Sequence, residues 1–192
     1  MTQTAVAQPL ASGADAELVR AAGRGDSAAF ERLVSDRAER AFRVARAILG
    51  ADADARDATQ EAFVAAWREL PRLRDVKAFD GWFRRILVNA CRAQQRSRRR
   101  VREISLDAAA FDKPAADFPL ADRIGETDAL ARAFRRLDTD KRTILVLHYL
   151  DHQPVAVLAR ALAVPIGTAK WRLSDARAAL ERALIAEGSP HR

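Results

Sequence analysis

Three acidic side chains in one short stretch are the first residues of this sequence that could support catalysis. Asp52, Asp54 and Asp57 carry carboxylates, which could bind a metal ion if they faced one point. A helix of 3.6 residues per turn, however, spreads carboxylates at this spacing over different faces. No histidine or cysteine lies near them, because all three histidines follow residue 147. The spacing therefore argues against a metal-dependent enzyme, and we predict no catalytic residue, metal or cofactor.

The stretch from residue 52 to residue 70 is better explained as a helix with one buried face and one exposed face. Its buried stripe would consist of small and aromatic residues at helical spacing: Ala55, Ala58, Thr59, Ala62, Phe63, Ala66, Trp67 and Leu70. The other stripe mixes acidic, amide, apolar and basic side chains: Asp57, Gln60, Glu61, Val64 and Arg68. Such a mixed face is typical of a helix that docks on a protein partner, but a solvated helix is also polar. Spacing alone leaves both interpretations open.

The overall composition favours a polyanionic partner and a reducing compartment. The 192 residues carry a net charge of +7, and arginine suits phosphates and guanine edges. A genome-wide composition bias would give the same arginine content, and this alternative stays open. A single cysteine, Cys91, excludes a disulfide framework, and no apolar run approaches the ~20 residues of a membrane span. We therefore expect a soluble cytoplasmic protein without a signal peptide, membrane insertion or small-molecule substrate.

Helical periodicity runs through most of the chain, and no alternating strand pattern is found. In the first half it predicts helices over 15–22, from the N-cap residue Asp26 to Gly50, over 52–70 and from Phe79 to residue 102, with a loop at 71–77. Segment 103–126 holds six acids against two basic residues and is expected to be an extended linker. Helical spacing resumes over 127–187, and residues 1–14 and 188–192 are expected to be tails. The predicted fold class is all-α, with two small helical domains at 15–102 and 127–187.

The helix that begins at Phe79 carries the most strongly basic face of the chain. Its apolar stripe is very regular and includes Trp82, for which core packing is expected and base stacking is the alternative. The opposite face carries Arg84, Arg85, Asn89, Arg92 and Arg96. Residues 84–102 hold eight arginines and no acid. Because like charges repel, so dense a run favours contact with backbone phosphates over a solvated helix end.

Residues 154–173 have the pattern of a helix-turn-helix. Leu158, Ala159 and Leu162 mark a first short helix, a turn follows at Ala163 and Val164, and Pro165 is expected at the N1 position of the second helix. Five apolar residues of the second helix are expected to face inward: Ala169, Leu173, Ala176, Leu180 and Leu184. Its outer N-terminal half, which contacts base edges in this motif, carries Thr168, Lys170, Trp171, Ser174 and Asp175. Two helices that merely complete a bundle would share this periodicity, but the basic charge and the exposed Trp171 favour DNA.

Three segments, in this order and at this spacing, resemble the bacterial sigma factors of the extracytoplasmic-function class. They are Asp54-Ala-Arg-Asp57-Ala-Thr-Gln60-Glu61-Ala-Phe63 through Trp67, Phe79-Asp-Gly-Trp82-Phe-Arg-Arg85-Ile86-Leu-Val-Asn89, and Val164-Pro165-Ile-Gly167-Thr168-Ala-Lys170 through Leu173. The resemblance covers roughly residues 15–185. It implies that 15–102 is sigma region 2, and that 127–187 is sigma region 4 with its helix-turn-helix.

The resemblance implies two partners, core RNA polymerase and promoter DNA. The outer face at Asp57, Gln60 and Glu61 would dock on the β′ clamp helices, with Val64 and Arg68 as further contacts, and region 4 would contact the β flap. The loop and the basic helix would bind and open the minus-ten element and hold a flipped base: Leu73, Arg74, Asp75, Arg84, Arg85, Asn89, Arg92 and Arg96. The minus-thirty-five element would be read by Thr168, Lys170, Trp171, Arg172, Ser174, Asp175 and Arg177, with Arg172 and Arg177 nearer the phosphates. The acidic linker would lead towards the RNA exit path of the polymerase.

At five positions the sequence departs from the pattern of these sigma factors. Val157 and Arg56 stand at positions where an acidic residue is usual, and Leu73 stands where an aromatic residue is common. Trp171 stands where a small polar residue is usual, and Asp175 stands where a basic residue is usual. These differences leave the promoter sequence open, because base readout depends on such side chains. The resemblance further implies an anti-sigma protein that covers both domains. The alternative is a helix-turn-helix regulator that is not a polymerase subunit, but it leaves the mixed face at 57–68 without a role.

Overall fold

The computed structural model describes residues 13–104 and 126–187, and every regular element in these ranges is helical. This result confirms the all-α fold class. The predicted linker at 103–126 and the two predicted tails lie almost entirely outside the described residues. Helix α1 (Gly13–Gly23) begins two residues before the predicted start, and α4 (Phe79–Ile104) extends two residues past the predicted end.

The first half consists of four helices whose ends follow from local chemistry. They are α1, α2 (Ser27–Leu49), α3 (Asp52–Glu69) and α4, and the loop between α3 and α4 contains two 3₁₀ turns, η1 (Leu70–Arg72) and η2 (Val76–Ala78). Asp26 caps α2, because its carboxylate accepts a hydrogen bond of 3.1 Å from the backbone N–H of Ala29. Gly50 ends α2 with a φ of 81°, a left-handed conformation that costs glycine little. Both predicted caps of α2 are confirmed.

Helix α3 packs closely against its neighbours because its buried face consists largely of alanine. Ala55, Ala58, Ala62 and Ala66 are each no more than 2% exposed. These small side chains allow α3 to lie against both α2 and α4. Aromatic rings fill the space beside the alanines: Phe63 of α3 stacks on Phe83 of α4 at 4.7 Å between ring centroids, and Trp67 packs on Phe30 of α2 at 4.9 Å. The predicted buried stripe of α3 is thereby confirmed.

The second half consists of α5 (Glu126–Arg136), α6 (Thr139–Leu145), the π-helical turn η4 (Val146–Leu150), α7 (Val155–Ala161) and α8 (Ile166–Ala186). Helix α8 packs against α5, α6 and α7, and α7 and α8 form the predicted helix-turn-helix. Ala163 in the turn has a φ of 54°, where a side chain is strained but tolerated in a tight turn. Pro165 is the N-cap of α8 and not its N1 residue as predicted, because its ψ of 151° is still extended.

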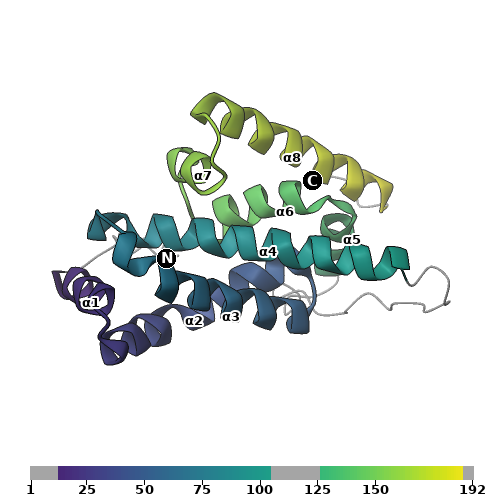
Figure 1. The fold of residues 1–192 in the computed structure, drawn as a ribbon. Coiled ribbons are helices and arrows are strands. Elements are labelled where there is room, and N and C mark those ends of the chain that lie inside the picture. Colours follow the sequence, from purple (N-terminus) through teal and green to yellow (C-terminus); the bar gives the residue numbers. More distant parts are fainter. Residues whose placement is uncertain (1–12, 105–125, 188–192) are drawn as a thin grey trace.

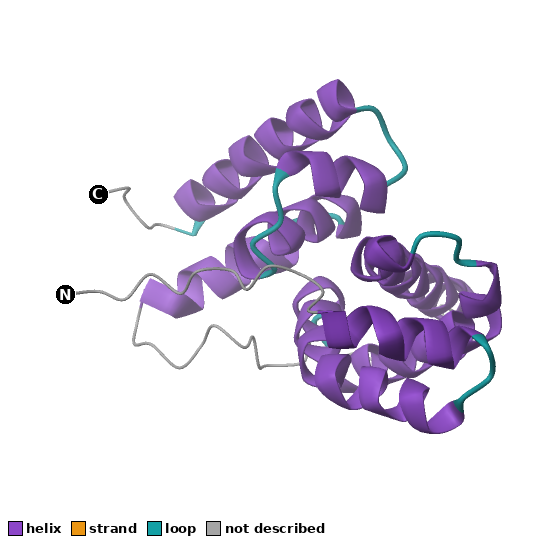
Figure 2. Cartoon of the chain, turned by 90° about the vertical axis from the view of Figure 1, so that its left-hand side faces the viewer, coloured by secondary structure: helices purple, strands orange, loops and turns teal. Residues whose placement is uncertain are grey.

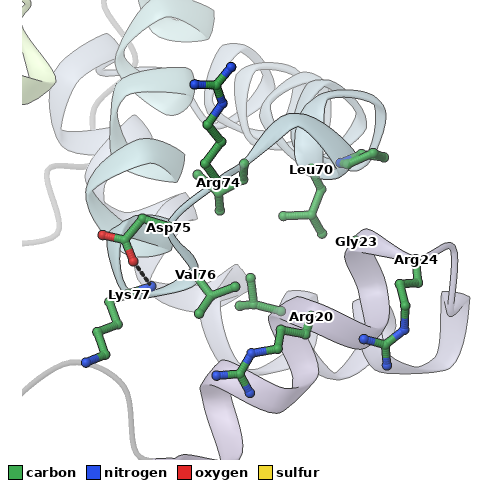
Figure 3. A pocket seen from close by; sticks show the side chains of 11 residues that line it. Arg20, Gly23, Arg24, Leu70, Arg74, Asp75, Val76 and Lys77 are labelled. Atoms are coloured by element: carbon green, nitrogen blue, oxygen red, sulfur yellow. Dashed lines mark hydrogen bonds between the residues drawn. The ribbon is translucent and has the colours of Figure 1, made fainter.

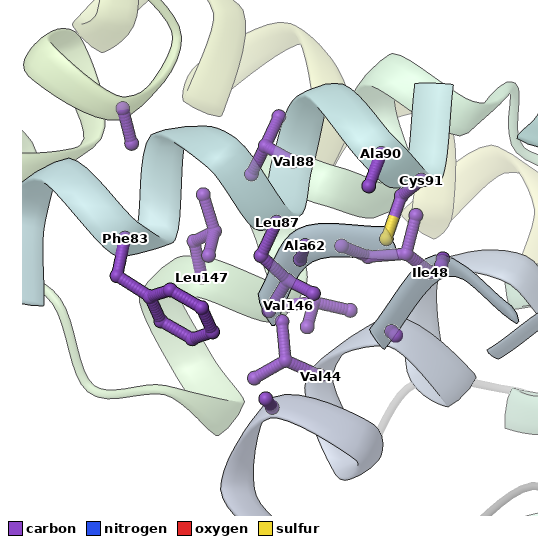
Figure 4. Close-up of a cluster of buried hydrophobic side chains, with 14 of the residues drawn as sticks. Val44, Ile48, Ala62, Phe83, Leu87, Val88, Ala90, Cys91, Val146 and Leu147 are labelled. Carbon is purple, nitrogen blue, oxygen red and sulfur yellow. The ribbon is translucent and has the colours of Figure 1, made fainter. Parts of the chain in front are cut away.

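Helix α4 lies between the two halves of the molecule (Figures 1 and 2). Helices α2 and α3 pack against it from the first half, and α6 and α7 contact it from the second. Val146 and Leu147 of η4 lie among first-half residues such as Val44, Leu87 and Val88 (Figure 4). The buried apolar residues of both halves therefore form one continuous cluster. None of the helices in the described ranges is both long enough and apolar enough to cross a bilayer.

Cys91 of α4 reports on the integrity of this cluster. Its side chain is 0% exposed, and burial raises the pKa of its thiol to about 12, so that the thiol stays protonated near pH 8. We expect iodoacetamide to leave the folded chain unmodified and to alkylate Cys91 in guanidinium chloride, as measured by intact-protein mass spectrometry. Rapid alkylation of the folded chain would show that the cluster opens readily.

Candidate protein-docking and nucleic-acid surfaces

The outer face of α3 presents a row of polar side chains on a rigid support. Asp57, Gln60, Glu61 and Arg68 are exposed, and Val64 is half-buried between them. The only hydrogen bond within the described residues that reaches this row is a long one of 3.5 Å from Gln94 to Asp57. The row therefore keeps its hydrogen-bonding capacity for a partner, while the alanine face behind it fixes its orientation.

The other two acids that opened the sequence analysis already have basic partners. Asp52 lies 2.6 Å from Nε of Arg46, and Asp54 lies 2.9 Å from Arg98 of α4. Each carboxylate thus neutralises a different arginine. The side-chain amide of Gln94 donates a hydrogen bond of 3.3 Å to Asp54 and one of 3.5 Å to Asp57, so the two acids share an amide donor. The described part of the chain holds no group of three or more metal-ligating side chains.

Helix α4 brings four of its five predicted nucleic-acid residues onto one face. Arg85, Asn89 and Arg96 are exposed, and Arg92 lies between them at helical spacing. Arg92 also contacts the second half, because its guanidinium lies 3.0 Å from the carboxylate of Asp140. The spacing of this row along α4 suits successive contacts with a phosphate backbone.

Arg84, the fifth of these residues, does not share that face. It is only 7% exposed, and its Nε donates a hydrogen bond of 2.7 Å to the carboxylate of Asp151, which lies directly after η4. In this arrangement Arg84 is not available to nucleic acid. The sequence could not indicate this, because its partner lies 67 positions further along the chain.

A hollow of about 420 Å³ separates α1 from the loop between α3 and α4. Figure 3 shows side chains of α1 on one side of the hollow and those of the loop on the other. Four basic residues surround it: Arg20 of α1, Arg24 of the turn that follows α1, and Arg74 and Lys77 of the loop. Its other lining side chains are mostly apolar and include Leu73. The size and the mixture of apolar wall and basic rim suit a flat, negatively charged ligand such as a nucleotide.

Sequence analysis placed Leu73, Arg74 and Asp75 in this region but missed the contribution of α1. Leu73 is half-buried against the core and Arg74 is exposed. Asp75 caps η2, because its carboxylate accepts a hydrogen bond of 2.9 Å from the backbone N–H of Lys77. The sequence offered only a weak signal for α1, two basic residues at the end of the helix and in the turn after it, Arg20 and Arg24.

The N-terminal part of α8 presents the predicted reading face of the helix-turn-helix. Lys170, Ser174 and Arg177 are exposed, and Trp171 is 67% exposed, which is unusual for so large an apolar side chain. Thr168 and Arg172 are half-buried at the edges of this face. Asp175 differs from the others, because its carboxylate lies 3.3 Å from Nζ of Lys141 in α6. This ion pair ties α8 to α6.

The far end of α8 is held by a second cluster of charges. Glu187 follows the helix, and its side chain is only 8% exposed between Arg132 and Arg136 of α5. The hydrogen bond from Arg132 is the main reason that the pKa of Glu187 lies below its ordinary value. Helix α8 is therefore fixed by charge near its middle, at Asp175, and directly after its last residue, at Glu187.

Comparison with known proteins decides what these surfaces belong to. The family model of sigma-70 region 2 matches residues 33–101, and that of sigma-70, region 4 matches residues 127–180. The ECF RNA polymerase sigma factor SigM of Mycobacterium tuberculosis is 35% identical over 174 residues, which are 88% of this chain and 84% of SigM. The chain belongs to the extracytoplasmic-function (ECF) sigma factors of the sigma-70 family. The RNA polymerase sigma-H factor of Pseudomonas aeruginosa is 29% identical to this sigma factor, over 88% of this chain and 93% of its own.

Solved structures of sigma factors share the fold. CnrH in complex with the cytosolic domain of CnrY matches with a TM-score of 0.65 and 27% identity, covering 90% of this chain and 98% of CnrH. The sigma factor RpoE of Bartonella quintana, in complex with the anti-sigma factor NepR, matches with a TM-score of 0.66 over 81% of this chain and 96% of its own, at 22% identity. The two matched regions of this sigma factor contain α3 and α4 in one case and the helix-turn-helix in the other.

The Glu187 cluster gives this sigma factor a pH-dependent stability. The pKa of Glu187 is lower in the folded state than in the unfolded state. The stability that its ion pairs contribute is therefore present above the unfolded-state pKa and is lost as the pH falls through the folded-state pKa. We expect Glu187→Gln to lower the urea midpoint near pH 7 and to differ little from the parent in acid below the folded pKa. Glu69→Gln, on the exposed end of α3, should leave the midpoint unchanged at both pH values. An equal loss at both would exclude the charge as the cause.

Proposed function

We propose that the exposed row on α3 is the surface through which this sigma factor binds core RNA polymerase. The observation that carries the proposal is the row itself: Asp57, Gln60 and Glu61 are exposed, mostly unpaired within the described residues, and supported by the buried alanines of α3. A polar row on a rigid helix binds without a loss of backbone conformational freedom, and its acids favour a basic partner surface. The β′ clamp helices are the partner that membership of this family suggests. The role proposed is a non-catalytic one.

Reversing the charge of this row tests the proposal. We expect Asp57→Lys and Glu61→Lys each to weaken binding to core polymerase by about thirtyfold or more, which corresponds to about 2 kcal/mol for a charged pair lost at an interface. The measurement is a binding titration of fluorescently labelled sigma factor with core enzyme, followed by transcription from a cognate promoter. Glu31→Lys makes the same charge change on an exposed position of α2 and should bind normally. Unchanged binding of both α3 variants would exclude this face.

The exposed row on α4 and the hollow beside α1 are proposed to bind the opened minus-ten element. Arg85, Asn89, Arg92 and Arg96 would follow the strand, with Asn89 placed to contact a base edge. The hollow would take a base rotated out of the duplex, which offsets part of the cost of unstacking. Arg20 and Arg24 are new members of this site, since both residues line the hollow from the side of α1.

The contribution of α1 can be separated from general electrostatics. We expect the double change Arg20→Ala and Arg24→Ala to slow promoter opening by about tenfold, as measured by the fluorescence of 2-aminopurine in the minus-ten element, with polymerase binding unchanged. The matched control is Arg32→Ala with Arg43→Ala, which removes two exposed arginines of α2. Equal slowing by the two double variants would mean that only overall charge matters.

The reading face of α8 is proposed to enter the major groove at the minus-thirty-five element. Lys170, Trp171 and Ser174 point outward from the N-terminal half of α8, and Arg177 lies one turn further along. Asp175 would orient α8 through Lys141 instead of contacting a base. A regulator that is not a polymerase subunit would use the same face, and loss of promoter-specific initiation in the α3 variants distinguishes the two functions.

An anti-sigma protein is proposed as a further partner. CnrH is seen with the cytosolic domain of CnrY, and the Bartonella quintana RpoE is seen with NepR. NepR is named an anti-sigma factor. Large apolar side chains exposed in the second half would suit such a protein: Tyr149, Leu150, Ile166 and Trp171. When released and bound to polymerase, the sigma factor would lie on the nucleoid.

A further inference from the structure

One buried carboxylate joins the two halves of this sigma factor. Asp151 is 4% exposed, and its two oxygens accept hydrogen bonds from different helices of the first half. Nε of Arg40 in α2 lies 2.6 Å from Oδ1, and Nε of Arg84 in α4 lies 2.7 Å from Oδ2. Arg40 donates a further hydrogen bond of 3.1 Å to the backbone carbonyl of Asp151. Hydrogen bonds between ionised groups are among the strongest in proteins, and this set is shielded from solvent on its acidic side.

The backbone of the second half holds Asp151 in place for this contact. Its N–H donates to the carbonyl of Val146 at 2.9 Å, which closes the π-helical turn η4. The next residue, His152, has a φ of 52°, and Gln153 donates from its side chain to the carbonyl of Asp151 at 2.5 Å. A π turn followed by a left-handed residue is a costly local geometry. Such geometry concentrates at functional positions, and here it directs one carboxylate at the first half.

A second ion pair and an apolar contact reinforce the junction. Arg92 of α4 lies 3.0 Å from Asp140, but Asp140 is 66% exposed, so that salt screens this pair strongly. Val146 and Leu147 are at most 4% exposed and pack among first-half residues, as Figure 4 shows. The junction therefore combines one buried ionic contact, one exposed ionic contact and a small apolar core.

Arg142 of α6 opposes this packing from within the same junction. It is only 9% exposed, and its nearest surroundings include Gly50 at the end of α2. Its Nη2 reaches the hydroxyl of Thr139 at a long 3.4 Å, and its Nε has no hydrogen-bond partner among the described residues. Burial lowers the pKa of Arg142, helped by the positive charges of Arg98 and Arg99. A buried cation with few hydrogen-bond partners is destabilising, and opening the junction would return it to water.

The distance between promoter elements shows that the closed arrangement cannot act. The minus-ten and minus-thirty-five elements are about 25 base pairs apart, which is about 85 Å along B-form DNA. A compact chain of this length has a radius of gyration of about 16 Å. The two halves must therefore separate before both elements can be engaged.

We propose that the Asp151 contact is an intramolecular latch that holds the free sigma factor closed and keeps Arg84 and Arg92 from DNA until the halves separate. This inference rests on the proposed roles of α4 and α8. The acids of the second half occupy arginines whose other ligand would be backbone phosphate. Arg142 keeps the closed state only marginally favoured, so that polymerase and promoter can open it. The latch acts within the chain and requires no anti-sigma protein.

The test uses the full chain without polymerase. We expect Asp151→Asn to raise the radius of gyration in small-angle X-ray scattering and to strengthen binding to a single-stranded minus-ten oligonucleotide by about tenfold or more. Arg40→Gln, which leaves η4 and the proposed DNA residues intact, should open the chain in the same way. Asp36→Asn removes an exposed acid of α2 and should change neither measurement. Asp140→Asn should have a smaller effect than Asp151→Asn, because its ion pair is exposed.

Separate controls distinguish loss of folding from opening of the junction. The far-UV circular dichroism spectrum and a cooperative urea transition show that each variant is folded. Compact scattering of folded Asp151→Asn and Arg40→Gln, or a parent chain already as extended as they are, would overturn the latch. Arg84→Gln should open the chain without the gain in DNA binding, since it also removes a DNA contact. Because scattering involves neither polymerase nor promoter, a failure of the proposed function would leave this result intact.

Discussion

The positions of all the surfaces described above depend on the close contact between α3 and α4. Ala58 and Ala62 allow this contact, because a larger side chain at either position would overpack the interface. Overpacking a core generally costs about 1–3 kcal/mol. With α3 fixed, its polar row faces outward and the loop that follows it is drawn back against α1. The hollow beside α1 is a consequence of that return, since the loop crosses α1 without filling the space in front of it. The close packing of α3 on α4 thus fixes the positions of the polar row on α3, the basic row on α4 and the hollow beside α1.

Charge pairing around α4 follows the same organisation. Helix α4 is rich in arginine, and both halves contribute acids that pair with it. Asp54 of α3 pairs with Arg98, and two acids of the second half, Asp140 and Asp151, pair with Arg92 and Arg84. These pairs permit a strongly basic helix to lie inside a compact molecule, where unpaired positive charges would repel one another. Within the described residues, Arg85 and Arg96 of the exposed row on α4 have no acidic partner, whereas Arg92 of the same row pairs with Asp140. The same residue type therefore serves cohesion on one side of α4 and recognition on another.

Much of this fold was predictable because its determinants are local. The caps at Asp26 and Gly50, the alanine stripe of α3 and the turn at Ala163 each depend on residues within a few positions, and each was found where the sequence placed it. The burial of Arg84 was not predictable, since helical spacing assigns it to the outer half of α4 and only the second half of the chain buries it. The wall that α1 adds to the hollow was missed for the same reason. Pro165 was misplaced by one residue, because an N-cap and an N1 proline differ only in ψ. The assignment of particular residues to polymerase or DNA stays a prediction.

The buried position of Arg84 also limits how this family can exchange its parts. Helix α4 belongs to the first half by sequence, yet the second half packs against one of its sides and supplies the carboxylate that accepts the hydrogen bond from Arg84. A hybrid factor that joined this first half to the second half of a relative would carry an arginine selected for a partner it no longer has. The two halves are thus not interchangeable modules, even though each reads a separate stretch of DNA in the proposed function. Their sequences must change together wherever they touch.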